Sequence, residues 1–297
     1  MFCKEKKTRL LPFAFIWLLL TQPLQAQYQS LLWQISGPGI KQPSFLYGTM
    51  HTADSRVFHF SKAVEPAFKN SKAFAMELDP SSQLAADVIV KLMMDEKHSL
   101  HQLLADSDYH FLDSLMLKKS GMGLAMYDKM SPIVITALLE QIAMSADEGE
   151  RVSEERDFLD MYFYRRAKKM RKKIIGIEEV QDQLKALNSL TYEEQALLLH
   201  EELDQARKDK KEGANVLELY VAQDLDGLLR ESDEMKMPPK FYYAMITARN
   251  AHMAERMAVL VLEKPTFIAV GALHLPGEEG VINLLRKKGF AVNPVKP

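Results

Sequence analysis

The chain reads Phe45-Leu46-Tyr47-Gly48-Thr49-Met50-His51 near its start and Phe267-Ile268-Ala269-Val270-Gly271-Ala272-Leu273-His274 near its end. Each stretch is an apolar run that leads into Gly-x-x-His, and such short apolar runs are typical of buried strands. Ligands of open α/β sheets bind at the carboxyl ends of the strands. The repeat therefore predicts that two histidines, His51 and His274, converge on one site.

Both motifs continue in the same way, with a polar turn, an amphipathic helix and a further apolar strand. The first unit has a helix expected over residues 63–70 and a strand over Ala73–Met76, and the second has a helix over 281–288 and a strand over 290–292. Strand-helix-strand order favours parallel strands. We therefore predict an α/β fold with a mostly parallel central sheet built from two related strand-GxxH-helix-strand units.

The segment between the two units has apolar residues at helical spacing. We predict a long all-helical insertion over about residues 81–173, inside one domain of residues 27–297. His98, His101 and His110 fall in this insertion without an acidic partner at matching helical spacing, and we interpret them as surface residues. A capping box is expected at Thr191, whose hydroxyl would bind the amide of Glu194.

A carboxylate is predicted to join the two histidines, because the strand Ala73–Met76 leads directly into Glu77. One carboxylate with two imidazoles is a common ligand set for Zn²⁺, Mn²⁺, Fe²⁺ or Co²⁺, and a water in the open position supports hydrolysis. The competing interpretation is that the three side chains form ordinary hydrogen bonds at strand ends and only stabilise the fold.

Glu178 is a second candidate acid, because it follows another expected strand at residues 173–177. A carboxylate in that position can hold the far nitrogen of a ligating histidine, or it can contact substrate. Capping of the helix that starts after Glu179 explains the same residues equally well.

These motifs resemble those of the TraB/PrgY/GumN family, which includes the Tiki proteins and is related to erythromycin-esterase-like and ChaN-like proteins. The resemblance covers most of residues 27–297 and is carried by residues 47–51, 76–79, 176–179 with Gln183, 249–250 with 253–254, and 271–277 with 280–281. Tiki proteins are described as metal-dependent proteases that use paired Gly-x-x-His motifs and a Glu. The resemblance thus implies His51, Glu77 and His274 as the core of the site.

The resemblance also singles out Arg249 and Asn250, on an expected helix that leads into the second motif. A guanidinium beside a metal can stabilise an oxyanion or orient a substrate carboxylate, and Asn250 is a candidate substrate contact. A buried salt bridge from Arg249 to Glu77 or Glu178 is the structural alternative.

The first 26 residues predict a secretory signal peptide. Four basic residues between positions 4 and 9 precede an apolar stretch over 10–20, and a small residue, Ala26, marks the expected cleavage point. Export to the periplasm or outside the cell follows, with an uncleaved N-terminal anchor as the alternative. Cleavage would also remove Cys3, the one cysteine of the chain, and with it any disulfide or thiolate ligand.

Composition narrows the class of partner. The chain carries 38 Lys and Arg against 40 Asp and Glu, and its basic run at 165–173 reads as the solvated end of a helix, so nucleic acid is not an expected partner. Sequence motifs of other enzyme classes, namely His-Glu-x-x-His, Gly-x-Ser-x-Gly and the P-loop, are absent from the sequence.

We therefore predict an exported metal-dependent hydrolase that cleaves peptide or amide bonds with Mn²⁺, Co²⁺ or Zn²⁺, and whose partner is a peptide or protein substrate. Glu77, Glu178 and Arg249 are its predicted catalytic residues. His59, just past the first motif, is a further side chain that could line the cleft. The alternative is a non-catalytic envelope protein that binds a metal, haem or a peptide signal in the same cleft.

Overall fold

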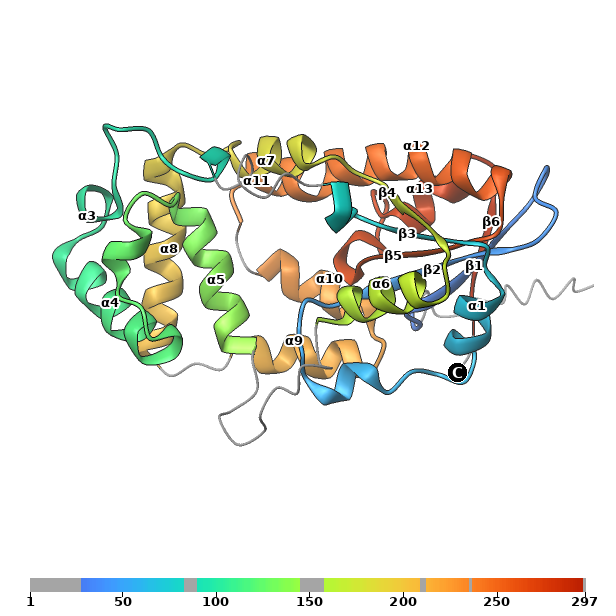
Figure 1. The fold of residues 1–297 in the computed structure, drawn as a ribbon, viewed down its shortest axis with the longest axis horizontal. Coiled ribbons are helices and arrows are strands. Elements are labelled where there is room, and N and C mark those ends of the chain that lie inside the picture. The colour runs from blue at the N-terminus through green and yellow to red at the C-terminus, as the bar shows by residue number, and fades with distance from the viewer. Residues whose placement is uncertain (1–27, 83–89, 145–157, 209–211, 235–236, 296–297) are drawn as a thin grey trace, which may run out of the picture.

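The computed structural model describes residues 28–82, 90–144, 158–208, 212–234 and 237–295, which form a six-stranded sheet with helices on both faces (Figure 1). The strands lie in the order β4 (Lys173–Gly176), β3 (Ala73–Met76), β5 (Thr266–Gly271), β2 (Ser44–Thr49), β1 (Leu32–Ser36) and β6 (Ala291–Pro294). The four strands from β4 to β2 are parallel, and β1 runs antiparallel to both of its neighbours. The predicted α/β class with a mostly parallel sheet is confirmed.

The two repeated units interleave in this sheet. β5, the first strand of the second unit, lies between β2 and β3 of the first unit and pairs with both. Thr49 pairs with Gly271, and Met76 pairs with Ala269. The carboxyl ends of β2, β5 and β3 therefore lie next to one another. The segments that carry His51, Glu77 and His274 therefore leave the sheet from neighbouring strands.

β1 is not among the predicted strands, because it lies outside both repeated units. Its Trp33 is fully buried and donates its indole N–H to the carbonyl of Ser30 at 2.8 Å. β1 separates β2 from β6 and thereby places the last strand of the second unit at the sheet edge. An antiparallel edge on a parallel sheet is a common arrangement in α/β folds.

Helices cover both faces of the sheet. In Figure 1, α12 (Ala248–Glu263) and α13 (Val281–Lys287) lie above it, and α1 (Val64–Asn70) and α6 (Leu159–Lys169) lie below it. The helices predicted near residues 63–70 and 281–288 correspond to α1 and α13. The other elements are η1 (Ser55–Phe58), η2 (Pro80–Ser82), η3 (Leu124–Tyr127), α7 (Val180–Leu187), α9 (Glu212–Val221), α10 (Leu225–Glu234), α11 (Pro239–Tyr242), the π-helical turn η4 (Tyr243–Thr247) and η5 (Ala272–His274).

An aromatic cluster fills the core between the sheet and α6. Phe163 is fully buried, and its ring centroid lies 5.2–5.4 Å from those of Tyr47, Phe60, Phe68 and Phe267. Aromatic pairs at these separations are stabilising beyond the area that they bury. The cluster ties the strand of each Gly-x-x-His motif to the same helix.

A second hydrophobic core lies in the helical segment at the left of Figure 1. It joins α3 (Leu100–Leu103), α4 (Asp106–Ser120) and α5 (Pro132–Met144), which come from the predicted insertion, to α8 (Tyr192–Arg207), which follows β4. The insertion thus packs on a helix from outside its own range. Thr191 and Glu194 form the predicted capping box at the start of α8.

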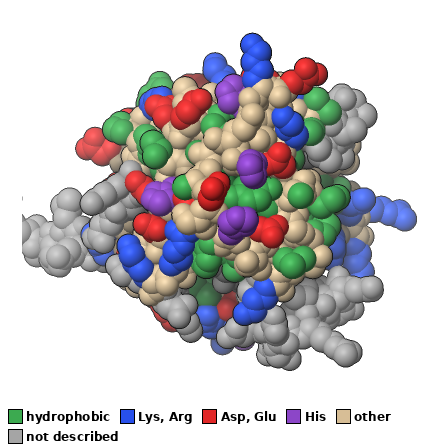
Figure 2. Space-filling view, turned by 90° about the vertical axis from the view of Figure 1, so that its left-hand side faces the viewer, with side chains coloured by type: hydrophobic (Ala, Val, Ile, Leu, Met, Phe, Trp, Pro, Cys, Tyr) green, Lys and Arg blue, Asp and Glu red, His purple; other side chains and the backbone are tan. Residues whose placement is uncertain are grey.

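Figure 2 shows the face that these helices present, where acidic, basic and histidine side chains are interspersed. His101 and His110 are exposed, in line with the expectation of surface residues. His98 is partly exposed, and its Nδ1 lies 2.7 Å from Asp95 Oδ1 in a turn before α3. The predicted signal peptide lies outside the described residues. None of the helices that are described is long and apolar enough to span a bilayer.

We predict that Phe163→Ala lowers the free energy of unfolding by about 3–5 kcal/mol, because it removes a buried ring and leaves a cavity among four others. Chemical denaturation measures the change. Val259→Ala, at a side chain that is 59% exposed on α12, is the control and should stay within about 0.5 kcal/mol of wild type. A loss below about 1 kcal/mol for Phe163→Ala would contradict this account of the core.

Candidate active site

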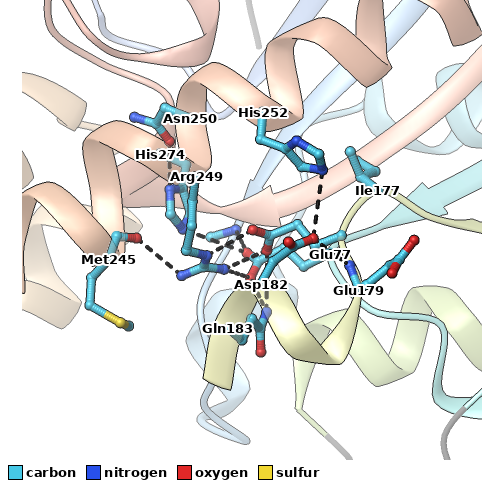
Figure 3. A network of polar contacts seen from close by, with 12 residues as sticks. Glu77, Ile177, Glu179, Asp182, Gln183, Met245, Arg249, Asn250, His252 and His274 are labelled. Carbon is cyan, nitrogen blue, oxygen red and sulfur yellow. Dashed lines mark hydrogen bonds and ion pairs between the residues drawn. The ribbon is translucent and has the colours of Figure 1, made fainter. Parts of the chain in front are cut away.

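The candidate site is a polar cluster at the edge where β3, β4 and β5 end (Figure 3). Glu77 follows β3, Glu178 follows β4, and His274 follows β5, while Arg249 and Asn250 reach the same place from α12. Most of the predicted site residues therefore converge, as the carboxyl ends of neighbouring parallel strands require.

Glu77 is held at both of its carboxylate oxygens. Oε1 accepts the backbone N–H of Gly271 at 2.7 Å, and Oε2 accepts Arg249 Nη2 at 2.8 Å. The Nε2 atom of His274 lies 4.0 Å from Oε1. The side chain is 16% exposed, so one edge of the carboxylate remains within reach of solvent.

Arg249 joins Glu77 to Glu178. Its Nε and Nη2 atoms donate to the two oxygens of Glu178 at 2.8 and 2.6 Å, and its Nη1 donates to the carbonyl of Met245 in η4. The Glu178 side chain is fully buried. The predicted alternative of a buried salt bridge is therefore observed to both acids. Capping of α7 falls to Glu179 and Asp182 instead of Glu178.

The charges in this cluster set its protonation states. Burial raises the pKa of Glu77, but the charges that His274 in its protonated form, Arg249 and His51 carry at low pH, together with the Gly271 N–H, lower that pKa overall, to about 2. Burial also lowers the pKa of His274. At neutral pH, Glu77 is thus a carboxylate beside a neutral imidazole.

Asn250 decides which nitrogen of His274 carries the proton. The Asn250 amide donates through Nδ2 to the carbonyl of Glu279 at 2.8 Å, so its Oδ1 is the atom that faces His274 Nδ1 at 2.6 Å. An amide oxygen only accepts, and Nδ1 must therefore be the protonated nitrogen. The lone pair of His274 is left on Nε2, which faces Glu77, and this is the arrangement seen in metal-ligating histidines.

The glycines of the two motifs are required by close packing between them. A Cβ on Gly48 would lie 3.1 Å from the Cα of Ala272, which is in the second motif. A Cβ on Gly271 would lie 3.3 Å from Glu77 Oε1 and 3.4 Å from the His274 ring. A side chain at Gly48 would press on the backbone of the second motif, whereas one at Gly271 would displace the side chains of Glu77 and His274 by a few tenths of an ångström.

His51 lies at the rim and has a different partner. Its Nδ1 is 3.1 Å from Asp160 Oδ2 of α6, and its side chain is 66% exposed. The hydrogen bond to Asp160 raises the pKa of His51 to about 9, and Glu77 contributes to the rise. The second oxygen of Asp160 is buried without a hydrogen-bond partner. His51 is thus electrostatically coupled to the cluster, but its polar contact is with Asp160.

The donor chemistry suits a divalent metal at Glu77 and His274. Both histidines direct Nδ1 to a protein oxygen, of Asn250 or Asp160, which leaves Nε2 for coordination. However, among the described residues no group of three or more His, Cys, Asp or Glu side chains is placed to hold an ion. A full ligand set would need His51 to turn inward and lose its proton.

Sequence reasoning missed two residues of this site. Asp160 has no spacing relation to the motifs, and only the fold brings α6 beside His51. Gln183 belongs to a motif that we noted, but its role comes from the structure, where Nε2 donates to both Glu77 Oε2 and Glu178 Oε2 at 3.3 Å. Arg256 of α12 also reaches this region and donates to the carbonyl of Ile177 at 2.7 Å.

Fold and site together define an α/β protein whose paired Gly-x-x-His motifs flank a buried Glu-Arg-Glu cluster. The sequence model of the TraB/PrgY/gumN family matches residues 31–294, and the chain belongs to this family. The resemblance inferred from the motifs is thereby confirmed.

Two relatives from Danio rerio are named metalloproteases. The chain is 23% identical over 329 residues to metalloprotease TIKI2, a match that covers 92% of this chain and 62% of that protein. It is 25% identical over 325 residues to metalloprotease TIKI1, with 92% and 64% covered. The chain thus spans less than two thirds of either relative.

A bacterial relative matches over more of its own length. An uncharacterized protein of Treponema pallidum is 23% identical over 283 residues, which cover 88% of this chain and 81% of that protein. No solved structure gave a significant match.

We expect Arg249→Met to lower the free energy of unfolding by about 3–5 kcal/mol, because it leaves two carboxylates unpaired, one of them fully buried. Arg230→Met, at a side chain that is 70% exposed, is the matched control and should change the stability by less than about 1 kcal/mol. Adding Glu178→Leu to Arg249→Met should recover part of the loss. Equal stabilities of Arg249→Met and Arg230→Met would rule out a stabilising ion-pair cluster.

Asn250 should control the tautomer of His274. In wild type at pH 7, ¹⁵N NMR of the imidazole is expected to show a proton on Nδ1 and none on Nε2. Asn250→Ala should give a mixture of tautomers, because the acceptor is lost. Asn283→Ala, which removes another amide that donates to a carbonyl, should leave the His274 spectrum unchanged. A wild-type spectrum with the proton on Nε2 would refute the assignment.

Proposed function

We propose that this protein is an exported metal-dependent hydrolase that cleaves peptide or amide bonds. The observation that carries the proposal is the carboxylate of Glu77 beside His274, whose Nδ1 is held by Asn250 and whose Nε2 lies 4.0 Å from Glu77 Oε1. Distant relatives named metalloproteases support the choice of peptide bonds. The expected partner is therefore a peptide or protein substrate.

Glu77, His274 and His51 are the residues proposed to hold a Mn²⁺, Co²⁺ or Zn²⁺ ion. When bound, such an ion supplies Lewis acidity toward water and the substrate carbonyl. Asn250 and Asp160 orient the two imidazoles through Nδ1. Asn250 is engaged at both ends of its amide, so we assign it to positioning His274 instead of to contact with substrate.

Glu77 is the proposed acid-base group. In hydrolysis, the water oxygen bonds to the carbonyl carbon and a water proton passes to a carboxylate. The same proton then goes to the leaving nitrogen as the C–N bond breaks. Glu178 is fully buried, whereas Glu77 is partly exposed, so Glu77 takes this role and Glu178 fixes Arg249.

Arg249 is proposed to orient Glu77. Its guanidinium donates to Glu77, Glu178 and Met245, and its side chain is 8% exposed, so it offers little free surface to a substrate. Stabilisation of an oxyanion, the role that the resemblance implied, would require these bonds to rearrange.

The test is a peptide-library digest by the purified chain with and without Mn²⁺, Co²⁺ or Zn²⁺, read by mass spectrometry. Glu77→Gln should reduce metal-dependent cleavage by roughly 10²–10⁴-fold, the usual contribution of an acid-base group. His51→Ala and His274→Ala should abolish both the cleavage and the thermal stabilisation by metal. His110→Ala, an exposed histidine on α4, is the control. Full activity in all three site variants would refute the proposal.

Non-catalytic binding is the second candidate, favoured by the engagement of His51 with Asp160 and the lack of a ready three-ligand group among the described residues. Haem titration separates the two candidates. A Soret band that disappears in His274→Ala, without any cleavage by wild type, would support an envelope protein that binds a ligand in this cleft.

A further inference from the structure

A cavity of about 260 Å³ is lined by residues at or near β1, β2, η1 and α9, among them Tyr47, which directly precedes the first Gly-x-x-His motif. Its apolar walls include Leu31, Leu32, Val57, Val64 and Val221. Pockets for drug-sized ligands are about 300–1,000 Å³, so this cavity is suited to a smaller group.

Two tyrosines, Tyr47 and Tyr220, also line the cavity. The hydroxyl of Tyr220 donates to the carbonyl of Gly48 at 2.8 Å, and Tyr47 packs its ring against Phe163 and Phe267. Both residues are buried, and burial raises the pKa of each hydroxyl, so they remain neutral. The two tyrosines therefore add no charge to the cavity.

The cation at the wall, Arg56, is already paired with two carboxylates, Asp54 at 2.9 Å and Glu218 at 2.5 Å. His59, a side chain that the sequence suggested could line the cleft, lines this cavity, and its Nδ1 faces the Arg56 carbonyl at 3.3 Å. An anionic ligand would have to compete with two carboxylates, whereas a neutral apolar group would not.

The wall also contains a residue in a strained conformation. Gln223 has a φ of 59°, a left-handed value that costs free energy outside glycine. Its side chain accepts the N–H of Leu31 at 3.3 Å and so joins the segment after α9 to the residue before β1.

The cavity and the candidate site share one segment of backbone. Gly48, whose carbonyl binds Tyr220, opens the first Gly-x-x-His motif, and η1, which forms one wall, follows His51 by four residues. Tyr47 and Gly48 therefore join a residue that lines the cavity directly to the first motif.

We propose that the cavity receives one large apolar side chain of a peptide substrate, such as leucine or phenylalanine, and so sets specificity next to the bond that is cleaved. The role of the cavity in specificity rests on the proposed hydrolase function. Binding of an apolar side chain depends only on the cavity.

The experiment measures binding of four probes by NMR titration of the full chain: the N-acetyl amides of leucine, phenylalanine, aspartate and lysine. The first two should bind and the charged pair should bind at least about tenfold more weakly, the range over which apolar pockets discriminate side chains. Val221→Trp and Ser61→Trp each place a large ring on a residue that lines the cavity and should each weaken leucine-amide binding at least tenfold. Val221→Ala should retain it, as should Val259→Trp, a matched exposed site on α12.

Equal binding of all four amides, or leucine-amide binding by both blocked variants at the wild-type level, would overturn the proposal. Peptide digestion with the same proteins distinguishes the two levels of inference. Selective binding that is lost in the blocked variants, without cleavage by wild type, supports the cavity and refutes the hydrolase function. Cleavage with no preference for apolar residues refutes the cavity assignment and leaves the hydrolase function standing.

Discussion

The rest of the site depends on one guanidinium shared by two carboxylates. Arg249 lies between Glu77 and Glu178, and all three side chains are largely or fully removed from water. Buried charges persist only when they are paired and hydrogen-bonded. One cation and two anions leave an excess of negative charge, which Gln183 and the Gly271 N–H stabilise through hydrogen bonds.

The fold and the main residues of this cluster are readable from the sequence, because they follow from local patterns. Apolar runs that end in Gly-x-x-His locate β2 and β5, and an apolar run before Glu77 locates β3. The contacts that set the orientation and protonation of the histidines cannot be predicted from these local patterns. Asp160 approaches His51 only because α6 packs on the sheet through Phe163. β1 carries no repeat signal, and the proton on His274 Nδ1 follows from a bond to Asn250 that no spacing encodes.

The two histidines occupy unlike environments although their motifs match. His274 is buried, neutral and oriented by an amide, while His51 is exposed and oriented by a carboxylate that favours its charged form. One extra residue precedes the glycine of the second motif, and in the sheet Thr49 therefore pairs with Gly271. The pseudo-symmetry of the sequence is thus broken at the site. Two imidazoles in unlike environments can have different roles, with His274 as a fixed ligand and His51 as an adjustable group.

The interleaving of β5 between β2 and β3 also constrains how the protein is made. The strand that completes the centre of the sheet is close to the end of the chain, and it pairs residues such as Phe45 and Phe267 from opposite ends of the described sequence. Closing so long a loop is entropically costly and slow. During synthesis, β2 and β3 are made before β5, the strand that lies between them. Glu77 is likewise made before its partners Arg249 and Gly271. The buried cluster therefore forms only after the chain has been made through β5, so that a chain that stops before β5 has no assembled site.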